Sequence, residues 1–370
     1  MWRRIRALMN KELLAMWQDR KSRILLIVPP ILQLFIFTFA ATLDVKNISI
    51  GVLNRDNGAQ SFELVQRLIG SPFFSQVIPL KGEPDLIESI NTQKILLALN
   101  FEETFSRNLL SGMPANVQLI IDGRKSNSGQ IAQGYVNRII KQYNEDFSEF
   151  LNFPPPLIRI IVRNWFNPNL IYPWFTLTGI VGILTMLTSL SVTGLSIARE
   201  RELGTFDQLL ITPLSSTEIL LGKSIPAILV GMSEGSLMLF AGVIVVQLPL
   251  VGSLLALYAG MFVFVVSIVG VGMLISSISR TQQQATLGMF LFMVPSVILS
   301  GYATPIDNMP EWLQKISVIN PLKYFIVISR GICMKGIPWS DVWRNIYPMI
   351  LIGSVNMLTC VYFFRSRVTR

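Results

Sequence analysis

Residues 254–279 read LLALYAGMFVFVVSIVGVGMLISSIS, and this stretch carries no charged side chain. A helix of about 20 apolar residues is long enough to cross the roughly 30 Å hydrocarbon core of a bilayer. The whole chain has the same character, because 51% of its 370 residues are hydrophobic, only 14% are charged and the mean hydropathy is +0.52. A soluble globular protein has a more polar composition. The sequence therefore predicts an α-helical integral membrane protein.

Other apolar stretches of similar length occur along the chain, and Glu234 is the one charged residue within them. The sequence predicts six transmembrane helices, at 24–43, 174–198, 225–246, 254–279, 285–304 and 346–364. A cleaved signal peptide is the competing interpretation of the N-terminus. The first apolar stretch is longer than the roughly 7 to 15 residues of the hydrophobic region of a signal peptide, so an uncleaved anchor fits better.

The basic residues predict the orientation, because Lys and Arg beside a span keep a loop in the cytoplasm. They gather in 1–23, in 199–223, at Arg280 and in 365–370. Six crossings place all of these on one side. Both termini, including the tail 365–370, are therefore predicted to be cytoplasmic, and residues 44–173 are predicted to lie outside the cytoplasm.

The segment 305–345 is apolar in part, but Lys323 and Arg330 lie within it. A seventh crossing would also move the basic C-terminus to the outside. We expect a re-entrant or short helical element at the outer face. Cys333 and Cys360 fall at opposite ends of this layout, too far apart for a disulfide. The chain has no histidine, which removes the commonest metal ligand and the usual general base.

Residues 44–173 have the pattern of a folded extracytoplasmic domain. They contain 12 Lys or Arg and 12 Asp or Glu, so the net charge of +9 lies beside the spans and does not form a nucleic-acid surface. Alternation and β-branched content predict strands and helices. The strands are expected at 48–53, 74–80 and 117–121, and the helices at 61–68 and 127–150. These elements predict an α+β domain.

Residues 1–23 predict a cytoplasmic amphipathic helix. Trp2, Ile5, Met9 and Leu13 recur every three or four residues, and basic residues occupy the rest of the helical wheel. Such a helix lies in the membrane interface. Two roles stay open for it: a basic anchor that fixes the topology, or a lever that transmits motion into the first span.

The connection between the second and third predicted spans, residues 199–224, is the most informative part of the chain. It begins with a run of charges, and a Gly-Thr pair is expected to start a short apolar helix over 206–211. A proline is expected to stop that helix. The next helix begins near Glu218, and its candidate caps are Ser215, Ser216 and Thr217. A short cytoplasmic helix with an apolar face has little membrane to cover, so it predicts a docking site for a partner. The residues we assign to this site are Arg199, Glu200, Arg201, Glu202, Gly204, Thr205, Phe206, Leu209, Leu210, Pro213, Leu214, Ser215, Glu218, Gly222 and Lys223.

Residues 201–223 resemble the ABC-2 family of ABC transporter permeases, whose cytoplasmic loop follows the pattern R-E-x-G-T-x-x-x-L-L-x-x-P-L-S-x-x-E-I-L-x-G-K. The layout of basic helix, outer domain and further spans is similar throughout, and residues 164–170, NWFNPNL, resemble the start of the second span in bacterial multidrug-export members. The resemblance implies that the connection couples an ABC ATPase subunit to the spans. It also implies a second permease copy or paralogue, a possible periplasmic adaptor, hydrophobic or amphipathic drugs as substrates, and the bacterial inner membrane as the location.

Gly222-Lys223-Ser224 imitates the end of a phosphate-binding loop, but the required first glycine would fall at Thr217. The chain is therefore expected to hold no cofactor and no catalytic or metal site of its own, with ATP and magnesium bound by the partner ATPase.

Glu234 is the other candidate functional residue. It lies between Gly231 and Gly235, which permit close approach of another helix, and an intramembrane carboxylate is unfavourable unless protonated or paired. It predicts either a proton or cation site or a neutral contact between helices. Three alternatives to an ATP-driven permease stay open: an ion-coupled transporter that uses Glu234, a receptor whose outer domain binds a ligand, and a membrane hydrolase, for which no nucleophile motif is present.

Overall fold

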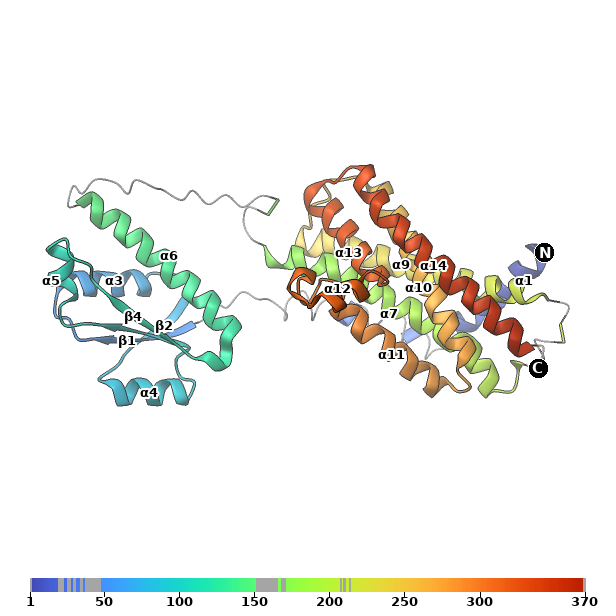
Figure 1. Ribbon diagram of the computed structural model, residues 1–370, viewed down its shortest axis with the longest axis horizontal. Helices are drawn as coiled ribbons and strands as arrows, with labels where there is room; N and C mark the ends of the chain where they lie inside the picture. Colours follow the sequence, from blue (N-terminus) through green and yellow to red (C-terminus); the bar gives the residue numbers. More distant parts are fainter. Residues whose placement is uncertain are drawn as a thin grey trace. The chain divides into compact units, whose positions relative to one another are not determined.

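The chain divides into two compact units, one formed by Met1–Ala41 with Asn164–Arg370 and the other by Thr42–Arg163. The computed structural model describes residues 2–18, 23–24, 28, 31–33, 36, 48–150, 166–167, 171–206, 208, 211–212 and 214–368, without the side chains of 15–16, 125–127, 149–150 and 365–368. Most of the predicted first span and of residues 164–170 lies outside the described residues. The first unit is helical and the second is built on a sheet (Figure 1).

The second unit, here called the sheet domain, holds one mixed sheet in the order β2-β1-β3-β4. β1 (Ile48–Asn54) is parallel to β2 (Phe74–Pro79) and to β3 (Leu97–Phe101), whereas β4 (Val117–Ile121) is antiparallel to β3. β1, β2 and β4 lie where the sequence predicts strands, and sequence analysis missed β3.

Helices alternate with these strands along the chain. They are α3 (Ala59–Ile69), α4 (Glu83–Asn91), α5 (Phe105–Leu110) and α6 (Ser126–Phe150), with the 3₁₀ turn η1 (Gly123–Lys125) before α6. α3 and α6 lie on one face of the sheet and α4 lies on the other (Figure 1). Two hydrophobic clusters, one for each face, bury Ile50 and Leu53 of β1 on opposite sides. Alternating strands and helices around parallel strands make an α/β arrangement, so the predicted α+β class is wrong in this respect.

The loops that follow β1 and β3 are joined by Asp56, whose side chain is only 7% exposed. Its Oδ2 accepts hydrogen bonds from Ser106 Oγ at 2.5 Å and from the Gly58 amide at 3.1 Å. Burial by itself raises the pKa of Asp56, but these hydrogen bonds lower it, and the net result is a pKa below the usual value. The ionised carboxylate therefore stabilises the sheet domain.

We predict that Asp56→Ala destabilises the sheet domain by about 1–2 kcal/mol, because it leaves the Ser106 and Gly58 donors unpaired. Since the folded-state pKa is depressed, the contribution of Asp56 is present above the unfolded pKa of about 3.9 and is lost as the pH falls through the lower folded value. Hydrogen exchange of residues 56–61 in the full chain, measured from neutral to acid pH, checks both effects. Exposed Glu103→Ala is the control, and equal exchange in the two variants contradicts the prediction.

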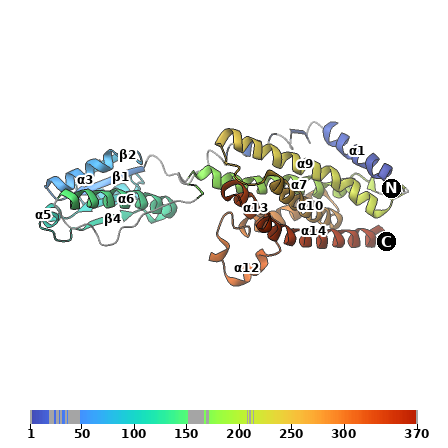
Figure 2. The ribbon, with the colours of Figure 1, turned by 90° about the horizontal axis from the view of Figure 1, so that it is seen from above.

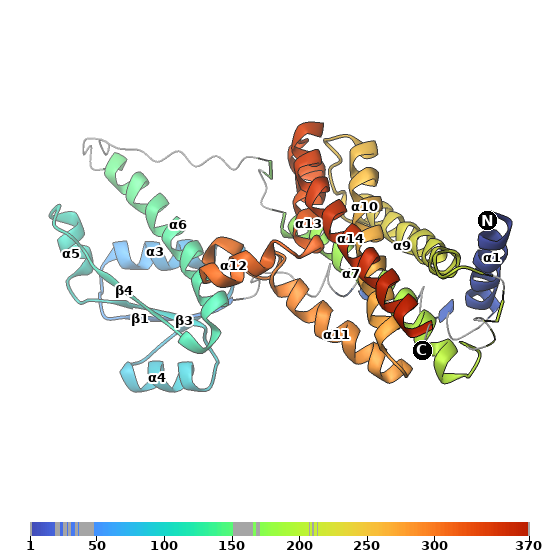
Figure 3. The same cartoon turned by 45° about the vertical axis from the view of Figure 1, so that its right-hand side comes forward.

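The helical unit contains α1 (Trp2–Gln18), α7 (Tyr172–Glu202), α9 (Ser216–Val246), α10 (Leu254–Ile278), α11 (Gln282–Ile298), η2 (Ile306–Asn308), α12 (Glu311–Ser317), α13 (Pro321–Arg330), the π-helical turn η3 (Gly331–Lys335) and α14 (Trp339–Val368). α10 is central, since it packs against α7, α9, α13 and α14. Figure 2 shows α1 beside α9, and Figure 3 shows α13 beside α14.

Four described helices are long and apolar enough to cross a membrane: α7, α9, α10 and α14. They correspond to four of the six predicted spans. α12 and the segment Pro321–Lys335 form a pair bent by 81°, as in a broken span or a re-entrant loop. Prolines punctuate this pair as expected, with Pro310 at the N-cap of α12 and Pro321 at the first position of α13.

The predicted span 285–304 differs from the structure, where α11 ends at Ile298. The chain then turns at Gly301, whose φ of +79° lies in the left-handed region that favours glycine. The turn brings Tyr302 against α7, where a Cβ at Gly179 would lie 2.2 Å from the Tyr302 ring. This contact takes the last residues of the predicted span out of the helix.

Candidate functional site

The connection between α7 and α9 begins later than the sequence indicates, because residues 199–202 form the last turn of α7. The helix closes through two backbone hydrogen bonds, from Gly204 N to Arg201 O at 3.1 Å and from Thr205 N to Glu200 O at 3.0 Å. Gly204 has a φ of +69°. This pattern is a Schellman motif. The Gly-Thr pair therefore closes α7, which the sequence did not indicate, and the chain is helical again at Phe206 and Gln208, where the next helix is predicted to start.

α9 begins with a capping box, in which Ser215 is the N-cap. Ser215 N donates to Glu218 Oε2 at 2.8 Å, and Glu218 N donates to Ser215 Oγ at 3.3 Å. Ser215, one of the three predicted caps, is confirmed. Leu209, Leu210 and Pro213 lie outside the described residues, as does most of the helix predicted over 206–211. Leu214 is partly buried and packs against the helical core.

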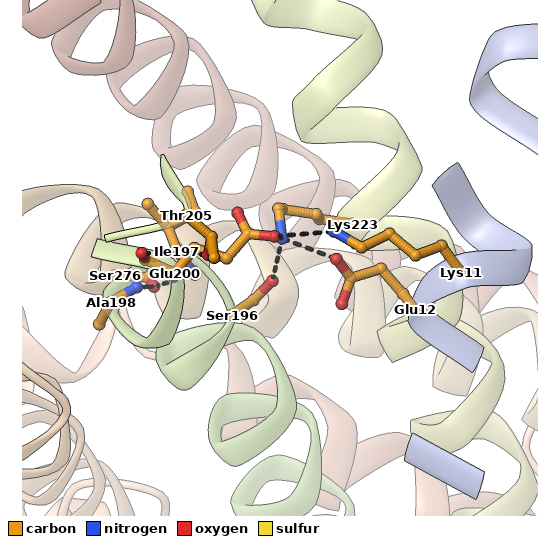
Figure 4. Close-up of polar contacts among 9 residues, drawn as sticks. All are labelled: Lys11, Glu12, Ser196, Ile197, Ala198, Glu200, Thr205, Lys223 and Ser276. Carbon is orange, nitrogen blue, oxygen red and sulfur yellow. Dashed lines mark hydrogen bonds and ion pairs between the residues drawn. The ribbon is translucent and has the colours of Figure 1, made fainter. Parts of the chain in front are cut away.

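An ion-pair cluster joins three helices beside this connection (Figure 4). Lys223 of α9 is 2% exposed, and its Nζ lies 3.0 Å from Glu200 Oε1 of α7 and 2.8 Å from Glu12 Oε1 of α1. Lys223 also donates to Ser196 Oγ at 3.2 Å, which occupies its third N–H. Lys11 lies 3.4 Å from Glu200 at the solvent side. The cluster contains two lysines and two glutamates, so its net charge is zero. The buried ammonium group of Lys223 is therefore compensated by carboxylates.

α1 packs on α9 through Ile5 and Leu8, both of which are buried, whereas Trp2 is exposed. Ile5, Met9 and Leu13 of the predicted apolar face are buried or half-buried, whereas Trp2 is not, and Leu8 joins the buried face. Gly222 makes this approach possible, because a Cβ at this position would lie 2.6 Å from Leu8 Cδ2. Successive residues of α9 thus have separate roles: Gly222 admits α1, and Lys223 binds it.

We predict that Gly222→Ala weakens the docking of α1 by about 1–3 kcal/mol, since the added methyl group overlaps Leu8. Hydrogen exchange of residues 2–18 in the full chain is the measurement. Leu8→Ala in the same chain should recover most of the loss. Gly134→Ala in α6, where a Cβ meets nothing within 4 Å, is the control and leaves exchange of α1 unchanged. A docking loss that Leu8→Ala fails to reduce contradicts the steric explanation.

Arg201 and Glu202 fasten the end of α7 to two further helices. Arg201 Nη1 donates to Ser277 O at 2.7 Å and to Ser279 O at 2.9 Å, at the C-terminus of α10. Its guanidinium also lies 4.8 Å from the centre of the Phe206 ring. Gln282 N, at the start of α11, donates to Glu202 Oε2 at 2.7 Å. These charges therefore act inside the chain, at helix ends whose partial charges they complement.

Several described residues of the connection remain exposed, among them two large apolar ones. Leu203 is 63% exposed and Ile211 is 85% exposed, and Arg199 is exposed beside them. Exposed apolar residues next to a fastened helix end form a surface that a partner can cover. The ATPase-docking role assigned to the motif stays a prediction, and these residues are among the described ones that are accessible to a partner.

Glu234 lies in α9 where α7 and α10 approach closely. A Cβ at Gly231 would lie 2.3 Å from Ser189 Oγ, and one at Gly235 would lie 2.5 Å from Met261 Sδ, so both glycines admit a neighbouring helix. Glu234 is 8% exposed, and its carboxylate oxygens have no hydrogen-bond partner of normal geometry among the described residues, although Thr188 is close. A buried carboxyl group surrounded by hydroxyl groups can hold a proton or a polar ligand.

The described residues contain no group of three or more Cys, Asp or Glu side chains placed to hold a metal ion. Cys333 and Cys360 are both free, and both are buried.

Sequence analysis missed Lys11, Glu12 and Ser196 as members of the cluster. Glu12 gave one signal, because it is the only acidic residue among the first 18 and lies in a basic helix. Its partner is 211 residues away in the sequence, and no local pattern indicates such a pair.

Several span-capable helices around α10, together with a connection fastened by buried charges, define a multi-pass integral membrane protein. Residues 20–360 match the model of the family described as "ABC-2 family transporter protein". The chain therefore belongs to the ABC-2 family of transporter proteins, and it is a permease-type membrane subunit of that family.

Three relatives show how similar its members are to this chain. The "Probable multidrug ABC transporter permease YbhR" of Escherichia coli (strain K12) is 41% identical over all of both chains. The "Probable multidrug ABC transporter permease YbhS" of the same strain is 33% identical over 96% of this chain and 93% of its own length. The "Inner membrane transport permease YhhJ" of Escherichia coli (strain K12) is 26% identical over 91% of this chain and 92% of its own length.

Proposed function

We propose that this chain is the permease subunit of an ATP-driven exporter in the bacterial inner membrane, with the ATPase on a separate polypeptide. Two permeases, identical or paralogous, form the pathway between them. The substrate class is hydrophobic or amphipathic small molecules, in agreement with the names of the relatives that share its full length. Both termini are cytoplasmic, and the sheet domain is extracytoplasmic, where it can meet an adaptor.

The buried position of Lys223 is the observation that carries this proposal. Its ammonium binds carboxylates of α1 and α7 while it belongs to α9. A force applied to residues 203–214 therefore moves three helices together, because separating them would leave buried charges unpaired. An ATPase that closes beneath this connection would tilt α7 and α9 as one body.

The test uses cysteine crosslinking in membranes that contain the full chain and the ATPase encoded nearest to its gene. Leu203→Cys and Ile211→Cys place a thiol on the exposed part of the connection, whereas Glu218 is unsuitable because it forms the capping box. The native cysteines are buried and stay in place. Exposed Phe62→Cys in the sheet domain is the control. Crosslinks from the connection and none from Phe62 support the proposal, and their absence favours an ion-coupled transporter or a receptor.

Glu234 supports a second candidate function, a proton- or ion-coupled transporter, because its buried oxygens lack hydrogen-bond partners among the described residues. The two functions differ in energy source. Transport that follows a pH gradient without any ATPase favours the second, and transport that requires ATP favours the first.

We predict that Glu234→Gln leaves assembly intact and lowers export about tenfold, as expected for the loss of one charge-assisted interaction of about 1.4 kcal/mol. The shape of the side chain is kept, so the packing at Gly231 and Gly235 is unchanged. Export by reconstituted protein is the measurement, with size-exclusion chromatography to confirm assembly. Wild-type export by this variant removes the functional role and leaves Glu234 as a neutral contact between helices.

A further inference from the structure

Arg330 ends α13 with a guanidinium that lies among aromatic rings. The guanidinium carbon is 3.8 Å from the centre of the Phe175 ring and 6.0 Å from that of the Tyr302 ring. Its Nε and Nη2 atoms are buried and have no hydrogen-bond partner in the described part of the chain. Removing a cation from water without a partner is unfavourable, and aromatic rings compensate only in part. Arg330 therefore lacks a counter-ion among the described residues.

The sequence around Arg330 cannot supply one. Phe175 belongs to the stretch 171–198, Tyr302 to 285–304 and Arg330 itself to 321–335, and none of these three stretches contains an acidic residue. An anion that neutralises Arg330 at this place therefore has to come from another part of the chain or from outside it.

Two more cations in the same segment have similar surroundings. Lys323 lies 5.8 Å from the centre of the Tyr324 ring, and Lys335 lies 5.4 Å from that of Phe166. Neither lysine makes an ion pair with the side chains that the structure describes. Lys323 and Arg330 are seven residues apart, which puts them on one face of α13, about 10 Å apart along its axis. The carboxylate of Asp307 is close enough to act on Lys323 electrostatically, but it forms no ion pair with it. The segment 321–335 is therefore a cationic element whose charges are not paired with acidic side chains of the described residues.

Helix α12, which precedes the segment 321–335, indicates what kind of anion binds this segment. Trp312 and Ile316 are four residues apart on α12 and both are exposed, and Ile319 is exposed in the turn that follows the helix. These apolar residues belong to a short helix and the turn after it, and a helix that carries cations follows across an 81° bend. Such an arrangement is typical of an element that lies at a bilayer interface. There the apolar residues meet acyl chains, and Lys and Arg meet phosphate groups.

We propose that Arg330 and its aromatic neighbours Phe175 and Tyr302 form a binding site for the phosphate headgroup of an acidic phospholipid. The guanidinium fork binds phosphate oxygens through Nε and Nη2, the two atoms that now lack partners. The rings exclude water, and the exposed apolar residues of α12 lie against the acyl chains. This site does not depend on the proposed coupling to an ATPase.

The test measures lipid retention by the full chain. Detergent-purified protein is titrated with phosphatidylglycerol or phosphatidylcholine, and bound lipid is counted by native mass spectrometry. The wild type should prefer phosphatidylglycerol by about tenfold or more, the size expected for charge-assisted hydrogen bonds. Arg330→Gln should lose that preference. Arg344→Gln on α14, where the arginine side chain is 83% exposed, is the matched control and should keep it.

Three outcomes overturn the proposal: no preference in the wild type, an unchanged preference in Arg330→Gln, or an equal loss in Arg344→Gln. If Arg330→Gln does not fold, Arg330→Lys replaces it, since it keeps the charge and loses the planar fork. A preference that is unchanged in that variant also contradicts the site. Excess inorganic phosphate distinguishes the source of the anion. Lipid that phosphate fails to displace supports the proposal, and lipid that phosphate does displace shows that the site takes a soluble anion instead.

Discussion

Replacing Lys223 by Met is expected to destabilise the junction of α1, α7 and α9 by about 3–5 kcal/mol and to abolish export. The substitution keeps an unbranched side chain that is one atom shorter and removes the ammonium. The carboxylates of Glu12 and Glu200 then share one cation, the exposed Lys11 beside Glu200. Removing one partner of a buried ion pair costs about this amount, because the remaining charge stays out of water.

Hydrogen exchange of residues 2–18 and 196–202 in the full chain measures the destabilisation, and ATP-dependent transport in proteoliposomes measures the functional loss. Lys11→Met is the matched control. It removes the same charge from the same cluster, but Lys11 is 61% exposed, so the expected cost is below about 1 kcal/mol. Equal effects of the two substitutions would show that burial of Lys223 has no special role.

A triple variant separates stability from coupling. Lys223→Met with Glu12→Gln and Glu200→Gln removes every buried charge at once, and replacement of a complete buried ion cluster by neutral groups is often tolerated. We expect the fold to recover and transport to stay low, because helices without ion pairs no longer move together. Full transport by the triple variant would contradict the role of the cluster as a mechanical link.

Arg201→Ala is expected to have the second largest effect, about 3 kcal/mol, since it removes two charge-assisted hydrogen bonds to carbonyls of α10. The contact with the Phe206 ring is lost as well. The end of α7 then separates from α10, so the ATPase should still hydrolyse ATP while export falls. The measurement is the ratio of transported substrate to hydrolysed ATP in reconstituted complex.

Arg199→Ala is the control for Arg201→Ala. The two arginines lie in the same helical turn, but Arg199 is exposed, and a surface substitution of this kind changes stability by less than about 0.5 kcal/mol. If Arg199→Ala uncouples transport as strongly as Arg201→Ala, the motif acts through contacts with the ATPase, and the helix-end contacts described above are secondary.

The motif of residues 201–223 shows how much of the site the sequence predicts. Capping residues act on amides two or three positions away, so Ser215 could be recognised from its neighbours alone. That the Gly204-Thr205 pair also closes α7 could not be predicted, because a glycine with positive φ fits either side of a loop and only the hydrogen bonds to Glu200 and Arg201 show its role.

By itself the sequence determined the membrane class, the positions of α7, α9, α10 and α14, three of the four strands and the family motif. Each of these depends on composition or on a period of two or three to four residues, which is local information. Only the tertiary structure decided that Lys223 is bound by Glu12 and Glu200, that Gly222 admits Leu8, and that α11 stops at Ile298 because Tyr302 folds onto α7. These contacts join residues that are far apart along the chain. They depend on burial and on charge compensation, and no periodic pattern in the sequence predicts such contacts.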